Sequence, residues 1–302
     1  MSTERSSPRF TDIDVWEPED IAESIIEGQM AAVAAAHAAR REIASAAVAM
    51  QAQLLEGGRL VYVGAGTSGR LAVQDGAELV PTFSWPEDRL LLLIAGGHKA
   101  LLRSVEGAED DINAGTKLID QHAINSTDVL VAVAASGTTP FTLACLREAK
   151  RRGALTIGIA NNSASPLLTE SDHPIFLDTG AEPIAGSTRL KGGTAQKVTL
   201  NTLSTLLMIL LGKIYRGLMV DVRALNAKLV RRSEDMLIQL TGRSRVEARE
   251  ALQRADGRVK IAALLLHGCD LDAARQLLRT SGDHLGKAFQ RVGGSGATEQ
   301  GR

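Results

Sequence analysis

The residues best suited to chemistry form a turn rich in glycine and hydroxyl groups at positions 64–69, Gly-Ala-Gly-Thr-Ser-Gly. An apolar run at 60–63 precedes this turn and a helical pattern follows from Arg70, so the pattern predicts a strand-to-helix connection. The first turn of a helix attracts anions, most often phosphate. The turn lacks the Gly-Lys-Ser/Thr end of a P-loop, and no acidic ribose partner follows a second strand, as a dinucleotide site requires. Because ordinary tight connections have similar sequences, this turn alone is a weak signal for a phosphate site.

A second turn of the same character, Ala-Ala-Ser-Gly-Thr-Thr-Pro at 134–140, follows another apolar strand candidate. In a doubly wound sheet, ligands bind beyond the carboxyl ends of the strands. Two such turns at one edge would make a cradle of neutral donors for one phosphate, although each hydroxyl alone could be a helix cap. The predicted phosphate-binding residues are Gly66, Thr67, Ser68, Ser136, Thr138 and Thr139.

Two glutamates are candidates for acid–base chemistry. Glu78 lies about three turns into the helix that follows the first turn, on a segment of small and apolar residues. Burial raises the pKa of a carboxyl group and suits it to act as a general acid near neutral pH; the alternative is an ordinary exposed helix residue. Glu109 belongs to an acidic segment, 106–111, which is also typical of a solvated helix start. Glu106 and Glu109 are three residues apart and can share a helical face, so these residues alone leave open which one is a base.

The basic residues give weaker signals. Lys191 is predicted to help hold a substrate, whereas Arg189 and Lys197 fit surface or interface pairing. His98 could reach a ligand, but an exposed loop position is the favoured interpretation. The histidines have no metal-ligand spacing, so the sequence predicts neither a metal nor another cofactor.

The elements that must position these residues alternate regularly. Helical patterns near 70–79, 98–118 and 140–151 separate the strand candidates Leu60–Val63, Leu90–Ala95, Val129–Ala134, Leu155–Ile159 and Ile175–Leu177. Apolar strands that alternate with helices predict an α/β fold with a doubly wound parallel sheet.

The flanking segments are predicted to be helical. An Ala-rich helical stretch runs from Glu17 to Leu55, a long helix begins at Lys191 and ends near Arg216, and helical sequence continues to Leu240. Three short capped helices follow, the first with capping-box spacing between Ser244 and Glu247. We therefore expect an N-terminal arm and helix (1–56), an α/β domain (57–240), a C-terminal helical module (241–292) and a disordered tail (293–302).

Composition narrows the class of protein. The chain has 302 residues and a net charge of −1, so no basic field favours nucleic acid or an anionic membrane. The longest strongly apolar run, 206–211, is far shorter than the roughly 20 residues of a membrane-spanning helix. Cys145 and Cys269 lie in helical patterns without paired spacing, as expected of buried residues in a reducing compartment. With no apolar signal segment at the start, the sequence predicts a cytoplasmic protein.

The chain resembles the sugar isomerase (SIS) domain proteins, and more closely the N-acetylmuramic acid 6-phosphate etherases of peptidoglycan recycling. The resemblance covers essentially the whole chain, and the C-terminal helices resemble that family's ubiquitin-associated-like module. The segments that carry it are 3–4, 64–71, 75–83, 95–97, 105–110, 135–140, 186–197 and 218–222. The chain departs from the family pattern at Gly76, Ala77, Leu79 and Val80, at Thr138, where the family has Arg, and at a Ser that replaces an early Asn. These changes bear on recognition of the sugar substituent.

The resemblance implies a mechanism and an assembly. It assigns Glu78 as the acid and Glu109 as the base of a reaction that removes D-lactate from C3 of a sugar phosphate, without a metal or organic cofactor. It also implies a homodimer in which the helical module docks near an active site, either its own or the partner's. Two alternatives remain: another SIS isomerase or lyase, which would not need an acid at Glu78, and a non-catalytic regulator that binds a sugar phosphate, similar to the glucokinase regulatory protein.

Overall fold

The computed structural model describes residues 3–222 and 227–295. The chain forms two compact units, of which the first comprises Met1–Glu78 with Pro86–Leu206 and the second Leu79–Trp85 with Leu207–Arg302. No helix in the described part of the chain is both long and apolar enough to cross a bilayer.

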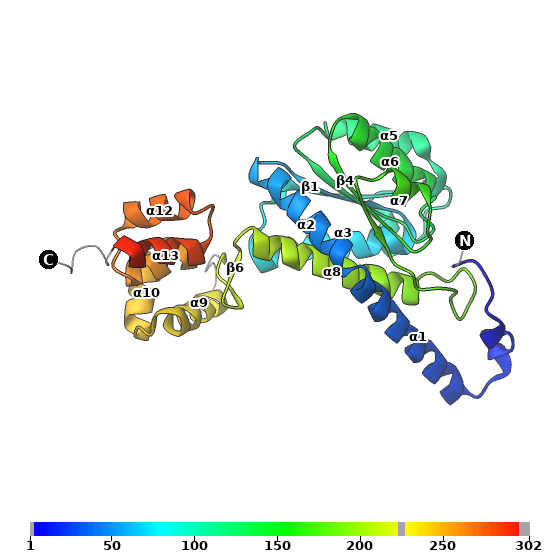
Figure 1. Cartoon of the computed structure of the whole chain (residues 1–302), viewed down its shortest axis with the longest axis horizontal. Helices are drawn as coiled ribbons and strands as arrows, with labels where there is room; N and C mark the ends of the chain where they lie inside the picture. The colour runs from blue at the N-terminus through cyan, green and yellow to red at the C-terminus, as the bar shows by residue number, and fades with distance from the viewer. Residues whose placement is uncertain (1–2, 223–226, 296–302) are drawn as a thin grey trace. The chain divides into compact units, whose positions relative to one another are not determined.

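A five-stranded parallel sheet organises the first unit, as the sequence predicted (Figure 1). Its order is β2-β1-β3-β4-β5, so β1 lies between β2 and β3. The register pairs Leu60 with both Leu90 and Val129, which brings the carboxyl ends of these three strands to one edge. The strands are β1 (Leu60–Gly64), β2 (Leu90–Ile94), β3 (Val129–Val133), β4 (Leu155–Ala160) and β5 (His173–Phe176).

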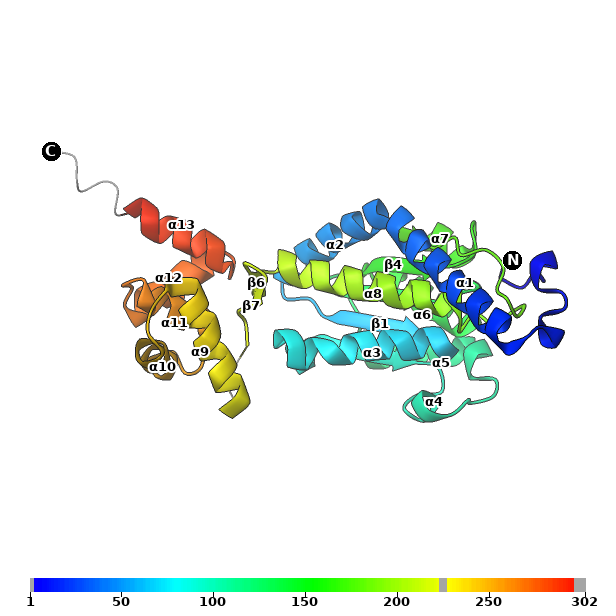
Figure 2. The ribbon, with the colours of Figure 1, turned by 90° about the horizontal axis from the view of Figure 1, so that it is seen from below.

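Helices cover both faces of this sheet, which explains why the central strands are apolar throughout. One face carries α5 (Ile112–Gln121), α6 (Pro140–Arg151) and α7 (Pro166–Glu170). The other carries α2 (Arg40–Leu55), α3 (Gly66–Phe83) and α8 (Lys191–Leu210), which lie side by side in Figure 2. All residues of β1 and β3 are buried.

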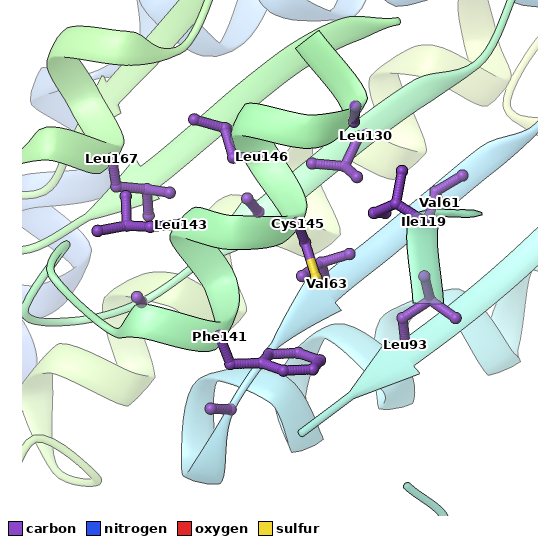
Figure 3. Packing of buried hydrophobic residues seen from close by; sticks show 14 of the residues in the cluster. Val61, Val63, Leu93, Ile119, Leu130, Phe141, Leu143, Cys145, Leu146 and Leu167 are labelled. Carbon is purple, nitrogen blue, oxygen red and sulfur yellow. The ribbon is translucent and has the colours of Figure 1, made fainter. Parts of the chain in front are cut away.

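The core beneath α6 is continuous (Figure 3). Val61 and Val63 of β1 and Leu130 of β3 pack in one cluster with Phe141 and Cys145. Burial raises the pKa of Cys145 to about 12, so this thiol is unreactive, as a core residue should be. Cys269 differs from its prediction: it follows α11 outside any helix and is only half-buried.

The predicted helix at 98–118 is wrong as a single element. The structure has α4 (Lys99–Leu102), a 3-10 turn (Ala108–Asp110) and then α5. Gly107 adopts φ +70°, which an α-helix cannot accommodate, and the Asp111 side chain caps α5 by accepting from the amide of Ala114. The acidic segment is therefore a loop that bends back toward the sheet edge.

The N-terminal helical stretch is also divided. It forms α1 (Pro18–Ala38) and α2, which meet at Ala39. Three further 3-10 turns span Pro8–Phe10, Ile13–Val15 and Glu87–Arg89.

The second unit contains a hairpin that the sequence reading missed. The strands β6 (Ile214–Tyr215) and β7 (Leu218–Met219) pair antiparallel where continuous helix was expected, and α8 ends at Leu210. Arg216 and Gly217, both with positive φ, form the two-residue turn.

Among the described residues of this unit, five helices follow the hairpin and share one hydrophobic core with it. Ser244 and Glu247 form the predicted capping box, and the nearly buried Lys260 pairs with Asp221 and Asp283. Of the predicted tail, residues 293–295 end the last helix and 296–302 lie outside the described residues. The helices are α9 (Ala227–Thr241), α10 (Arg245–Arg254), α11 (Val259–Leu266), α12 (Leu271–Thr280) and α13 (Leu285–Ser295).

Candidate active site

The turn after β1 is shaped by close backbone contacts. A Cβ on Gly64 would lie 2.8 Å from the Cα of Gly69, so both positions require glycine. Gly66 adopts φ +53° and begins α3. The amides of this first helical turn have no partner within the helix and form an anion-binding end. Ser68 in this turn is 8% exposed and Thr67 is half-buried.

The turn after β3 lies at the same edge because β1 and β3 are adjacent and parallel. Gly137 has φ +69°, and a Cβ there would meet the Oγ of Ser165 at 2.1 Å. The Ser136 hydroxyl accepts from the amide of Thr138 at 3.1 Å and lies 3.4 Å from the hydroxyl of Thr139. The structure therefore places the two predicted phosphate turns on neighbouring strands.

A hollow of about 200 Å³ lies on the other side of the β1 turn, toward the loop after β2. Its lining is about equally polar and apolar, and we call it the polar hollow for its charged side chains. Glu106 and Glu109 both line it, together with Gly66 and Arg70. The Oε2 of Glu109 is 4.0 Å from the position of a Cβ on Gly66. The fold thus brings Glu109 to the phosphate turn, while Glu106 stays open as an alternative base. Arg70 was not predicted as a site residue.

Glu78 lies elsewhere on the single chain. Twelve residues of α3 separate it from Gly66, which corresponds to about 18 Å along the helix. Its side chain is exposed, so the burial expected from its small and apolar neighbours is not found in one chain. An extended glutamate side chain cannot span that separation. Glu78 and Glu109 of the same chain are therefore not brought together.

The surroundings of Glu78 are nevertheless well ordered by Asp75, one turn earlier on α3. Asp75 is 5% exposed and accepts hydrogen bonds from the Tyr62 hydroxyl at 2.9 Å, Asn201 at 2.5 Å and Ser204 at 3.2 Å. These contacts fix α3 against β1 and α8. Burial, with Asp75 beside it, raises the pKa of Tyr62 well above its usual value, so Tyr62 stays a neutral donor. Lys197 donates to Asn201 at 2.5 Å, a surface pairing of the kind predicted for it.

Lys191 opens α8 and does not line the polar hollow. Its amide and that of Gly192 donate to Glu182 at 3.2 and 2.8 Å. Glu182 is fully buried, and burial raises its pKa although the two amides oppose the shift. The aliphatic part of Lys191 lies beside Gly28 of α1. His98 is exposed in the loop before α4.

The N-terminal segment contributes a contact that the residue types alone did not reveal. Thr3 is fully buried, and its hydroxyl accepts from Asn162 at 2.9 Å. The same Asn162 amide donates to the carbonyl of Ala135, next to the β3 turn. Thr3 thus supports the edge of the sheet at which the turns lie.

A second hollow of about 400 Å³ between α5 and α6 is mainly apolar and contains neither predicted acid. Two of its basic residues, Arg147 and Arg151, already pair with Glu170 and Glu148. In the described part of the chain, no three His, Cys, Asp or Glu side chains gather as metal ligands do.

Two family models and solved structures of other proteins match parts of the chain. Residues 42–150 match the glucokinase regulatory protein N-terminal SIS domain, and residues 112–209 match the SIS domain. A solved phosphoheptose isomerase from Francisella tularensis is 20% identical with a TM-score of 0.46, over 65% of this chain and 98% of that one.

Curated relatives match far more of the sequence. An N-acetylmuramic acid 6-phosphate etherase from Deinococcus radiodurans is 50% identical over 283 residues, 93% of either chain. One from Streptomyces coelicolor is 45% identical over 291 residues, 96% of this chain and 93% of the relative. This chain therefore belongs to the N-acetylmuramic acid 6-phosphate etherase family of SIS-domain proteins.

Proposed function

We propose that this chain is a carbon–oxygen lyase that converts N-acetylmuramic acid 6-phosphate and water into N-acetylglucosamine 6-phosphate and D-lactate. The relatives that match over nine-tenths of the chain carry this name. The structural observation that carries the proposal is the position of Glu109, whose carboxylate lies against Gly66 of the phosphate turn. A base at this place can reach the sugar whose phosphate the turn holds.

The proposed reaction proceeds by elimination and then addition. The open-chain aldehyde makes the hydrogen on C2 acidic, and Glu109 takes it as a proton. The C3–oxygen bond then breaks, and lactate leaves with a proton from Glu78. Water adds to C3 of the resulting double bond while C2 regains a proton. Two carboxyl groups in opposite protonation states supply this chemistry.

The substrate would be held by its phosphate. Gly66, Thr67 and Ser68 offer donors from one turn, and Ser136, Thr138 and Thr139 from the other. Lys191 is a further proposed binding residue. We place the enzyme in the cytoplasm, as expected for the recycling of a sugar phosphate.

We further propose a homodimer in which the Glu78 of a second copy completes the site. The acid must act next to the carbon from which the base takes its proton, yet in one chain Glu78 lies about 18 Å along α3 from Gly66, the residue beside which Glu109 lies. An exposed apolar stripe on α1 supports self-association: Ile26, Met30 and Val33 are 65, 64 and 53% exposed at helical spacing.

A non-catalytic sugar-phosphate sensor is the second candidate, since residues 42–150 match the glucokinase regulatory protein domain. Incubation of the purified chain with N-acetylmuramic acid 6-phosphate, followed by an enzymatic D-lactate assay, separates the two. We expect catalytic release of lactate, and none from the unphosphorylated sugar. Tight binding of the sugar phosphate without lactate release would favour the sensor.

A further inference from the structure

The proposed substrate carries two anions, and the two turns account for only one of them. The phosphate lies at C6, whereas a carboxylate lies at the end of the lactyl group on C3. A site that distinguishes the lactyl ether from other sugar phosphates needs a partner for this second charge. The assignment of that partner rests on the proposed function.

The polar hollow lies on the correct side of the site. The phosphate turns follow β1 and β3, while the hollow lies between the β1 turn and the loop after β2. Gly66 belongs to both, so a sugar whose phosphate occupies the turns extends past Gly66 into the hollow. The substituents at C2 and C3, at the far end from the phosphate, then lie among the residues that line it.

Arg70 is the one basic side chain among the described residues that line this hollow. Its Nε–H donates to the carbonyl of Ala100 at 2.8 Å, which fixes the orientation of the guanidinium group. In residues 3–222 and 227–295 it has no carboxylate partner, in contrast to Arg59, Arg147 and Arg152. A half-buried guanidinium beside two glutamates and without an ion pair is set to receive an anion from a ligand.

We propose that Arg70 binds the lactyl carboxylate of the substrate and so determines the specificity for the lactyl ether. Its two terminal amino groups remain available for a carboxylate, a geometry that suits the guanidinium better than a lysine. The contact would also orient the ether bond next to Glu109. It disappears once lactate has left, because the product lacks the carboxylate.

Two variants of Arg70 separate the effect of its charge from that of its hydrogen bond to Ala100. Arg70→Gln keeps an N–H for the carbonyl of Ala100 but removes the charge, and Arg70→Lys keeps the charge without the planar fork. Arg103→Gln is the matched control, because Arg103 is exposed at the end of α4 and does not line the hollow. Each protein is assayed with N-acetylmuramic acid 6-phosphate and with its lactyl carboxamide, which keeps the ether but not the charge.

We expect Arg70→Gln to lower kcat/KM for the acid about 10- to 100-fold, mainly through KM. The carboxamide should react equally with wild type and variant, Arg70→Lys should recover part of the loss, and Arg103→Gln should resemble wild type. Exchange of the C2 hydrogen of N-acetylglucosamine 6-phosphate in D₂O should stay within about threefold, because this product has no lactyl group.

Two results would overturn the assignment without touching the proposed function. One is an equal loss with acid and carboxamide, and the other is a parallel loss of C2 exchange, which would give Arg70 a structural or phosphate-binding role. A wild-type chain that releases no lactate would instead remove the proposed function, and this inference with it.

Discussion

Glu106 and Glu109 line the same hollow but differ in the conformation of the backbone around them. Glu109 lies within the 3-10 turn Ala108–Asp110, with its carboxylate at Gly66, while Glu106 precedes the left-handed Gly107. The position of its carboxylate beside Gly66 is the reason that we propose Glu109, and not Glu106, as the base. The structure is needed to distinguish them, because both are glutamates of the same acidic segment and the sequence alone leaves open which one is the base.

We therefore expect Glu109→Gln to lower kcat by about 10²- to 10⁴-fold and to abolish exchange of the C2 hydrogen with solvent deuterium, since an amide cannot accept that proton. Glu106→Gln serves as the control and should retain exchange. Mass spectrometry of the sugar in D₂O measures both. Loss of exchange in Glu106→Gln together with normal exchange in Glu109→Gln would move the base to Glu106.

One ion pair joins the residues that lead into β1 and β3. The Nη2 of Arg59 lies 2.6 Å from the Oδ2 of Asp128, whose side chain is 1% exposed. Burial alone would raise the pKa of Asp128, but hydrogen bonds from Arg59 and Asn125 outweigh it and hold the pKa below its usual value. Because the native pKa lies below that of the unfolded chain, the pair stabilises the fold above about pH 4. The contribution disappears as the pH falls through the native pKa.

Asp128→Asn should accordingly reduce the free energy of unfolding by roughly 3 kcal/mol at pH 7, because it leaves the Arg59 guanidinium without its charge partner. The difference from wild type should shrink in acid. Urea unfolding at pH 7 and pH 3 measures it. Asp120→Asn is the control: Asp120 is 71% exposed in its pair with Arg152, so its loss should cost less than about 1 kcal/mol. Equal losses in the two variants would disprove a stabilising clamp at Asp128.

The secondary-structure elements differ in how accurately the sequence predicts them. All five strands were predicted to within about two residues, because each contains a short apolar run between turns. The loop at 103–111 and the hairpin at 214–219 were not predicted. The loop depends on a left-handed backbone at Gly107, and the hairpin on one at Arg216. Arg70 was missed because nothing in a helical pattern marks a side chain that meets the loop after β2. Glu78 looked buried from its neighbours, but one chain leaves its side chain on the surface.

The separation of Glu78 from Glu109 in one chain gives a test of the proposed dimer. In a twofold dimer with Glu78 acting across the interface, each site takes Glu109 from one copy and Glu78 from the other. A mixed dimer of Glu78→Gln and Glu109→Gln subunits then contains one intact site and one doubly altered site. If both residues acted within one chain, the same mixed dimer would contain no intact site.

Each variant alone should be nearly inactive in lactate release. Equal amounts unfolded and refolded together should recover about one quarter of the wild-type activity, because half the dimers are mixed and each of these has one working site. Refolding each variant separately before mixing is the control. If co-refolded subunits pair, as two different affinity tags would report, and yet stay inactive, the acid does not come from the second copy.

The neutrality of the phosphate turns bears on what happens after catalysis. Residues 64–69 and 134–140 offer amides and hydroxyls and contain no Lys or Arg. If Arg70 provides the charged contact to the lactyl carboxylate, it binds the part of the substrate that the reaction removes. The sugar product keeps the neutral donors of the turns and the proposed contact with Lys191 but loses the contact with Arg70, so bond cleavage itself weakens its binding. Such an enzyme would suffer little product inhibition and could keep working while its product accumulates.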